Sequence, residues 1–322
     1  MKLLLLLAAL WLPLHGQVTI TLQGGQVAAV SVDGKPFTDF FFAGPEVTKP
    51  YLHPLRAATG TYVTRMWPMA EVPNEPRDHK HQRGVWFAHA KVNGLDFWNN
   101  EASYTTPNRG KITLDPAVPV KVHGGKREGS ITATFDWTDL KGEKLLSESR
   151  SMVFHSYPKL RIVDFDITLK AVTQVTFFDE KDGVFGIRMR PDLQEQKRSR
   201  ELTVPGEPGH IVNADGLEGE KQLWGKPSNW CDYYGTVNGE TVGIAILDHP
   251  ANPRHPVRWH ARGYGLFAAN PFGLAVFTND KSQNGNLVLE PGKTLRFRYR
   301  VIIHPGDTKS ADIAGQWKEY AK

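Results

Sequence analysis

The stretch DHKHQRGVWFAH, residues 78–89, holds three histidines and an arginine within twelve positions. Side chains alternate between two faces along a strand, so His79, His81 and Arg83 would share one face if this stretch is extended. Lys80 and Gln82 would then face the other way. Because an imidazole can donate one hydrogen bond, accept another and exchange protons near neutral pH, the stretch predicts a site that binds a polar ligand.

Two other interpretations of these histidines stay open. Neutral imidazole coordinates divalent metals, so His79, His81 and a third histidine could hold a metal ion. Alternatively, the histidines are structural groups at the margin of a loop. His53, in KPYLHPL, could join the cluster only through folding. We favour a polar ligand, because a guanidinium beside the histidines suits polar recognition and two histidines at this spacing are a weak metal signal.

A second histidine-rich stretch, ILDHPANPRHPVRWHARGYGLFAANPFG, covers residues 246–273. Its prolines restrict the backbone and lower the entropic cost of ordering a site. Trp259 and Tyr264 offer apolar faces on which a sugar ring could stack. The polar candidates here are His249, Asn252, His255 and His260. We expect the two histidine-rich stretches to line one shared cleft, although an irregular loop with aromatic core anchors would show the same pattern.

The stretch FFDEKDGVFGIRMR, residues 177–190, places acidic residues ahead of a strand that carries Arg188 and Arg190. Glu180 is the preferred general base because it lies near that strand, although acidic residues in turns are often only solvated. The residues expected to act in catalysis are His79, His81, Glu180 and His255. Those expected to bind the ligand are His53, Arg83, Arg188, His249, Asn252, Trp259 and His260.

The elements that must position these residues are mainly strands. Alternating apolar and polar residues, rich in β-branched and aromatic types, predict strands over 18–22, 129–137, 161–171, 241–247 and 295–303. Long loops are expected over 67–82 and 192–210. The tail has helical spacing, with Ile313, Trp317 and Tyr320 on one side and Asp307 or Thr308 as the cap. The pattern predicts an all-β, antiparallel sandwich with a short C-terminal helix.

The N-terminus reads MKLLLLLAALWLPLHGQ, which predicts a signal peptide over residues 1–16 and one β-sandwich domain over 17–322. We therefore expect an exported protein, periplasmic or extracellular, that is not embedded in a membrane. Cys231 is the single cysteine in the sequence, so no internal disulfide and no cysteine-based metal site can form. The net charge of +5 comes from mixed basic and acidic residues, without the basic stripe that nucleic-acid binding requires.

Several long motifs resemble the PmoA family, exported bacterial proteins that carry the label "methane oxygenase". They include PYLHPL, DHKHQRGVWFAH, GVFGIRM and GIAILDHPANPRHPVRWHARGYGLFAANPFG. Lys80 stands where such proteins usually have a different residue in an HPHH motif. Membrane methane oxidation is not expected, because the mature chain has no apolar stretch of the roughly 20 residues that a spanning helix needs. The resemblance implies a supersandwich similar to galactose mutarotase, which binds sugars through histidine, arginine and carboxylate side chains.

We therefore expect an exported protein that binds or acts on a carbohydrate, by proton transfer of the epimerase, mutarotase or lyase type. The alternatives are a metal-dependent oxidoreductase or hydrolase that uses a histidine-bound divalent metal, and a glycan-binding protein without catalysis. No nucleophile elbow, phosphate-binding loop or HExxH motif occurs. The sequence does not indicate the sugar or the oligomeric state.

Overall fold

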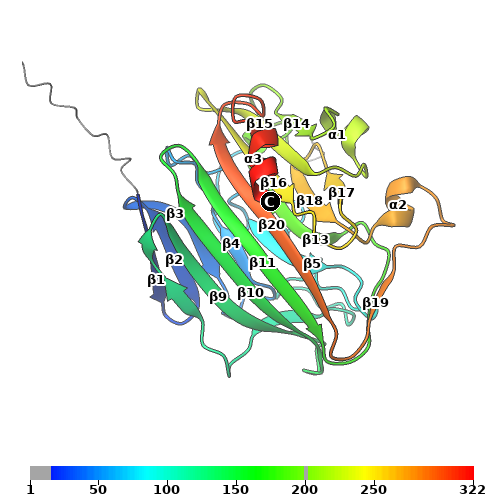
Figure 1. Cartoon of the computed structure of the whole chain (residues 1–322). Helices are drawn as coiled ribbons and strands as arrows, with labels where there is room; N and C mark the ends of the chain where they lie inside the picture. Colours follow the sequence, from blue (N-terminus) through cyan, green and yellow to red (C-terminus); the bar gives the residue numbers. More distant parts are fainter. Residues whose placement is uncertain (1–15, 199–201) are drawn as a thin grey trace, which may run out of the picture.

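The computed structural model describes residues 16–198 and 202–322, so the predicted signal peptide lies outside the described residues except for Gly16. Two large antiparallel sheets face each other, as Figure 1 shows. In spatial order the first sheet contains β17 (Arg258–Ala261), β18 (Leu266–Asn270), β13 (Gly183–Arg188), β5 (Val85–His89), β4 (Tyr51–His53), β3 (Lys35–Phe41), β2 (Val27–Val32), β1 (Gln17–Gln23) and β8 (Gly125–Lys126).

The second sheet is built from strands that lie between residues 111 and 305. Its order is β14 (His210–Asn213), β15 (Trp230–Val237), β16 (Glu240–Asp248), β20 (Thr294–Pro305), β11 (Arg161–Ala171), β10 (Lys144–Ser156), β9 (Glu128–Thr138) and β6 (Lys111–Leu114), with β7 (Lys121–His123) also paired to β9. A small separate ladder joins β12 (Val175–Phe177) to β19 (Leu287–Leu289). The helical segments are η1 (Pro191–Leu193), α1 (Gly219–Leu223), α2 (Leu274–Thr278) and α3 (Ile313–Tyr320).

The predicted all-β, antiparallel fold is confirmed, and each of the five predicted strands lies within an observed one. In β9 the buried side chains are Ile131, Ala133, Phe135 and Trp137, while the residues between them are more exposed. This alternation follows from the period of two along a strand. The hydrophobic pattern therefore fixed which face of the strand turns to the core.

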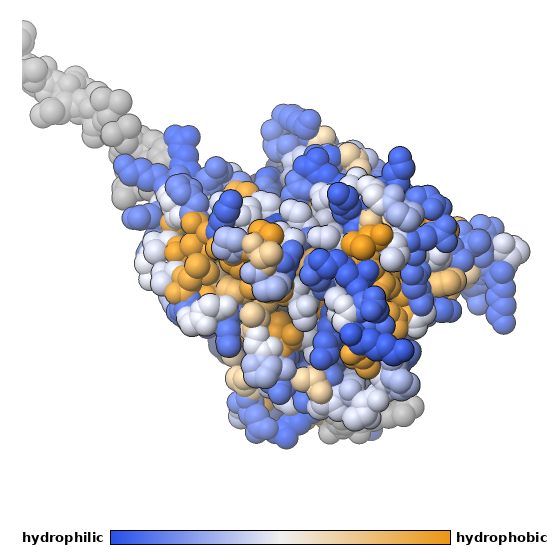
Figure 2. All heavy atoms as spheres, turned by 90° about the horizontal axis from the view of Figure 1, so that it is seen from below, coloured by the Kyte–Doolittle hydropathy of each residue, from blue (hydrophilic) through white to orange (hydrophobic). Residues whose placement is uncertain are grey.

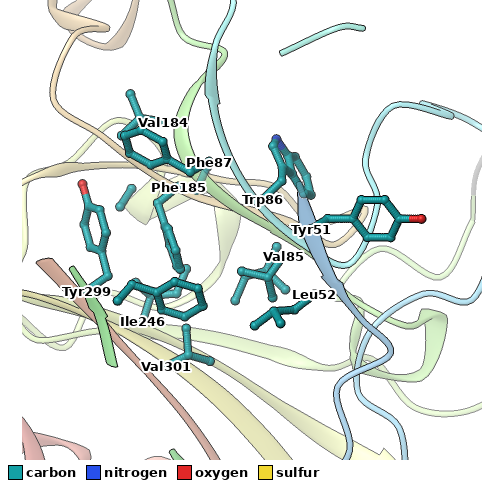
Figure 3. Packing of buried hydrophobic residues seen from close by; sticks show 14 of the residues in the cluster. Tyr51, Leu52, Val85, Trp86, Phe87, Val184, Phe185, Ile246, Tyr299 and Val301 are labelled. Carbon is teal, nitrogen blue, oxygen red and sulfur yellow. The ribbon is translucent and has the colours of Figure 1, made fainter. Parts of the chain in front are cut away.

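The core lies between the two sheets. Phe185 of the first sheet stacks on Tyr299 of the second, with ring centroids 4.7 Å apart. Figure 3 shows these two rings with Phe87 above Ile246 and Val301, all within one apolar cluster. Because this packing orients β5 and β13, it also determines which of their residues point away from the core.

A second apolar cluster lies on the other side of the second sheet, beneath helix α3. Ile313 is fully buried there and belongs to one cluster with Trp230, Leu247 and Ile302. The predicted C-terminal helix is present, but its predicted cap is wrong. Asp312 caps the helix, because its carboxylate accepts a hydrogen bond from Gly315 N at 3.1 Å.

The surface seen from below in Figure 2 is mostly hydrophilic, with hydrophobic side chains in separate patches. Within residues 16–198 and 202–322, no helix is both long enough and apolar enough to cross a membrane.

Candidate functional site

A cavity of about 630 Å³ brings together residues from several separate stretches of the chain. Its lining consists of Pro76, Asp78, His79, His81, Gln82, Asn99, Lys181, Asp182, Gln196, His260, Arg262 and Tyr264. In β17, Trp259 belongs to the core between the sheets, so the next residue, His260, points to the opposite face. The cavity therefore lies on the side of the first sheet that is turned away from the second sheet.

The loop before β5 forms one wall of the cavity, and buried Arg65 holds this loop in shape. The Arg65 guanidinium donates hydrogen bonds to the carbonyl oxygens of Asp78 (2.7 Å), His79 (2.9 Å) and Gln82 (3.2 Å). His79 has a φ of 46°, a left-handed conformation that is uncommon outside glycine. Gln82 N donates to His79 O at 2.9 Å and closes the turn.

This turn corrects the expectation that His79, His81 and Arg83 share a strand face. The strand begins only at Val85, so the period-two argument does not apply to the residues before it. Instead His79, His81 and Gln82 all line the cavity. Arg83 does not line it, because its guanidinium is paired with Glu101 at 2.9 Å and 2.5 Å.

Asp78 and His79 form a hydrogen-bonded pair at the cavity wall. His79 Nδ1 lies 2.5 Å from Asp78 Oδ2, so Nδ1 carries the proton and Nε2 of a neutral ring is an acceptor. Burial alone would raise the pKa of the Asp78 carboxyl. The hydrogen bond from His79 and the charges of Arg188 and Arg65 outweigh that effect and hold this pKa well below its usual range. Ionised Asp78 can thus orient His79 as a base.

His81 and His260 are buried, neutral imidazoles in the same cavity. Burial and the nearby Lys49 ammonium lower the pKa of His81 to about 2, and its Nε2 has no hydrogen-bond partner in the described chain. Burial lowers the pKa of His260 to about 4. His260 Nδ1 lies 2.9 Å from Lys181 O, and a carbonyl only accepts, so Nε2 of His260 is an acceptor. Neutral rings of this kind can accept hydrogen bonds from a ligand.

Lys181, Asp182 and Arg262 contribute charges to the cavity lining. Lys181 Nζ lies 2.8 Å from Asp182 Oδ2, and Arg262 Nε forms an ion pair with Glu220 at 2.6 Å. Tyr264 stacks on His79 with centroids 5.2 Å apart and an angle of 4° between the rings. The ring of Tyr264 therefore supports the imidazole that Asp78 orients.

Two predicted ligand-binding residues lie behind this wall. Arg188 is fully buried and donates to Gln82 Oε1 at 2.6 Å and to Asp78 Oδ1 at 2.8 Å. It does not line the cavity but fixes two residues that do. His53 is buried at the end of β4, where burial and the charges of Arg56, Arg83 and Arg65 lower its pKa to about 3.

The second histidine-rich stretch is divided between two places. His260 reaches the cavity, but His249, Asn252 and His255 lie in the loop after β16, beside helix α3. His255 Nδ1 and Asn252 Nδ2 each lie 2.7 Å from a carboxylate oxygen of buried Asp248. None of these three residues lines the cavity, so the stretches share the site through His260 and Tyr264.

Trp259 and Glu180 also take positions that differ from their expected roles. Trp259 is fully buried, and its indole nitrogen donates to Ser228 O at 2.9 Å, so no ring face is available to a sugar. Glu180 Oε1 accepts from Lys181 N at 2.9 Å, and the residue does not line the cavity. Asp182, two residues further on, occupies the wall instead.

A metal site with His79, His81 and a third histidine is not supported by the geometry. In the described ranges, no group of three or more histidine, cysteine, aspartate or glutamate side chains is arranged to hold a metal ion. The ring centroids of His79 and His81 are 5.8 Å apart, and the angle between the two ring planes is 80°.

Several residues of the cavity were not among the site residues predicted from the sequence. They are Pro76, Asp78, Gln82, Asn99, Lys181, Asp182, Gln196 and Arg262. Asp78 directly precedes His79, and this adjacency was an available signal for an oriented imidazole. Asn99 and Gln196 carried no comparable signal, since they come from loops that only the fold brings to the cavity.

The chain belongs to a family described as "Family of unknown function (DUF6807)", which residues 28–318 match. No curated protein matches the sequence.

Solved structures show similarity at low sequence identity. A galactose mutarotase-like protein from Clostridium acetobutylicum is 10% identical, with a TM-score of 0.42, and the match covers 90% of this chain and 98% of that chain. GH36 alpha-galactosidase AgaA from Geobacillus stearothermophilus, as the A355E variant, is 9% identical, with a TM-score of 0.38; 90% of this chain matches 40% of that one. Heparan sulfate lyase HepC from Pedobacter heparinus is 12% identical, with a TM-score of 0.37; the corresponding shares are 91% and 35%. The closer relationship to galactose mutarotase stays a prediction.

Proposed function

We propose that this protein binds a carbohydrate in the cavity beside β13 and transfers a proton on it. The observation that carries the proposal is the Asp78 carboxylate, which orients His79 at 2.5 Å within a cavity that also holds neutral His81 and His260. In this arrangement Nε2 of His79 is the base, and Asp78 stabilises the imidazolium that forms.

A carbohydrate suits this cavity because its wall offers both donors and acceptors. Gln82, Asn99 and Gln196 carry amide groups, and the histidines add acceptor nitrogens. A volume of about 630 Å³ lies within the range of roughly 300–1,000 Å³ that small-molecule sites have. Sugar hydroxyls need such mixed partners, since each can donate and accept.

The reaction that fits best is proton transfer at a sugar carbon or at the anomeric centre, as in an epimerase, a mutarotase or a lyase. His79 would act as the base and His81 would contact the ligand near it. His260 would bind the ligand from β17. Glu180 and His255 have no part in this arrangement, because neither lines the cavity.

Export from the cytoplasm and membership of the PmoA family stay predictions. Export fits the proposal, since an exported protein of this kind would meet free sugars and glycans outside the cytoplasm.

Deuterium exchange in heavy water tests the proposal. The purified protein is incubated with a panel of mono- and oligosaccharides, and each sugar is examined by NMR for loss of a carbon-bound proton and for new products. Anomerisation is followed separately by polarimetry, since mutarotation moves only hydroxyl protons. We expect one sugar class to exchange or anomerise with the wild type, and the rate to fall by about a hundredfold or more in His79→Gln. The matched control is His123→Gln, an exposed histidine on β7.

Thermal unfolding in the same sugars separates binding from catalysis. A ligand at a hundred times its dissociation constant stabilises the protein by about 2.7 kcal/mol. Stabilisation without exchange, anomerisation or products would mean a glycan-binding protein and would contradict the catalytic part. If no sugar stabilises the protein, the whole proposal is wrong. Exchange that disappears after chelation would instead favour the metal-dependent alternative.

A further inference from the structure

We infer that the ligand of this cavity is an acidic sugar, whose carboxylate is bound by Arg262 with help from Lys181. This inference rests on the proposed carbohydrate site and names its substrate class.

Arg262 is the first observation. It lines the cavity with about a third of its side chain exposed (33%), and its Nε forms an ion pair with Glu220. In the described part of the chain, its terminal nitrogens form no hydrogen bond, although the guanidinium lies 5.6 Å from the centre of the Tyr264 ring. The unused fork of two N–H groups matches the geometry of a carboxylate.

The two carboxylates of the cavity wall already pair with cations or with His79, although Asp182 Oδ1 accepts no hydrogen bond from the described residues. Asp78 Oδ1 accepts from Arg65 at 2.9 Å and from Arg188 at 2.8 Å, while Oδ2 accepts from His79. Asp182 Oδ2 accepts from Lys181 Nζ. The Lys181 ammonium has three N–H groups and uses one of them in this contact. Asp78, the carboxylate that contacts His79, therefore has both oxygens engaged, whereas Arg262 and Lys181 keep unused N–H groups, which favours an anionic group of the ligand beside these two cations.

The position of Arg262 also suits the proposed chemistry. His79 stacks on Tyr264, and the Arg262 guanidinium lies near the same ring, so the cation and the base lie one ring apart. In a uronate, the carbon next to the carboxylate carries a C–H bond whose electrons can move into the carboxylate when the proton leaves. His79 Nε2 would take that proton, and Arg262 would stabilise the charge that develops on the carboxylate oxygens.

The step is balanced without any further reagent. The C–H bond breaks, its proton moves to His79, and its electron pair forms a carbon–carbon double bond to the carboxylate carbon. Return of a proton from the imidazolium to the same carbon restores the sugar acid. In heavy water this carbon would acquire deuterium.

The experiment compares matched pairs of acidic and neutral sugars by calorimetry. The ligands are the methyl glycosides of D-glucuronate, D-galacturonate and D-mannuronate, each set against the methyl glycoside of glucose, galactose or mannose. We expect at least one uronate to bind about tenfold or more tightly than its neutral partner. Arg262→Gln should remove most of that preference while the affinity for the neutral sugar changes by less than about threefold.

Further variants separate the loss of a cation in the cavity from a general loss of folded structure. Lys181→Gln changes a partly exposed side chain and should reduce the preference less than Arg262→Gln does. Arg262→Lys keeps the positive charge but loses the two parallel N–H groups of the guanidinium. Its preference for the uronate over the neutral sugar should therefore lie between those of the wild type and Arg262→Gln. The matched control is Arg296→Gln, an exposed arginine that pairs with Asp166 on the second sheet.

The outcomes separate this inference from the proposed function. If acidic and neutral sugars bind equally, or if the preference survives in both Arg262→Gln and Lys181→Gln, the inference is wrong while the carbohydrate site stands. If none of the acidic or neutral sugars binds, both are wrong. Deuterium at the carbon beside the carboxylate, lost in His79→Gln, would support both together.

Discussion

Arg188 and Asp78 are joined by a hydrogen-bonded ion pair of 2.8 Å that ties the end of β13 to the loop before β5. Asp78 receives a second guanidinium, that of Arg65, at 2.9 Å. Both arginines are almost completely buried. The carboxylate that orients His79 is therefore also the counter-ion of two buried cations.

Asp78→Asn should lower both stability and activity. The amide would leave two buried guanidinium groups without a counter-ion, and we expect a loss of about 3 kcal/mol in the free energy of unfolding. Urea denaturation followed by fluorescence measures this loss. Asp166→Asn is the control, because its ion pair with Arg296 is exposed and should cost less than about 1 kcal/mol. Equal losses in the two variants would contradict the structural role of Asp78.

Replacing Asp182 and Glu180 in turn distinguishes the two carboxylates of the turn before β13. Asp182 lines the cavity and binds Lys181, so Asp182→Asn should reduce proton exchange on the sugar by about tenfold or more. Glu180→Gln should leave the exchange rate within about twofold, because its carboxylate accepts from Lys181 N and does not line the cavity. If Glu180→Gln has the larger effect, the sequence-based choice of general base was correct and the cavity assignment is not.

Trp259→Phe should affect stability and leave sugar binding intact. The indole is fully buried and donates to Ser228 O, so the smaller ring leaves a void and an unpaired carbonyl, at a cost of about 2 kcal/mol. Thermal unfolding measures the cost, and titration calorimetry measures the affinity. A loss of affinity with unchanged stability would restore Trp259 as a sugar-stacking residue.

Acid should destabilise the protein below about pH 6.5, before most carboxylates titrate. Burial lowers the pKa of His53 to about 3, that of His81 to about 2, and those of His89 and His260 to about 4. As the pH falls below about 6.5, the unfolded chain takes up protons that these folded histidines reject. Each such histidine can cost up to about 1.4 kcal/mol for each pH unit until its folded pKa is reached.

Urea unfolding at a series of pH values checks this slope, and His304 provides a control of opposite sign. Its pKa is raised, because the charge and hydrogen bond of buried Asp232 outweigh the effect of burial. His304 therefore adds stability below its unfolded pKa of about 6.5, and this contribution is lost as the pH rises through the folded value. His304→Asn should cost more stability at pH 5.5 than at pH 8.5, whereas stability that is independent of pH in the wild type would contradict the buried neutral histidines.

The local signals in the sequence were sufficient for the strands and for part of the site. Alternation with period two located β9, β11 and β20, because burial on one side of a strand leaves a direct trace in residue type. The density of histidine in residues 78–89 likewise pointed to His79 and His81, which do share a cavity with His260.

Tertiary structure alone decided which charged residues face the cavity. Arg83 and Arg188 looked equivalent as ligand-binding candidates, yet Glu101 holds the first away from the cavity and Asp78 holds the second behind its wall. Asn99, Gln196 and Arg262 come from separate loops, and no local pattern indicates that they meet. Periodicity reports which face of an element is buried, but the partner of a charged side chain depends on contacts between residues far apart in the chain.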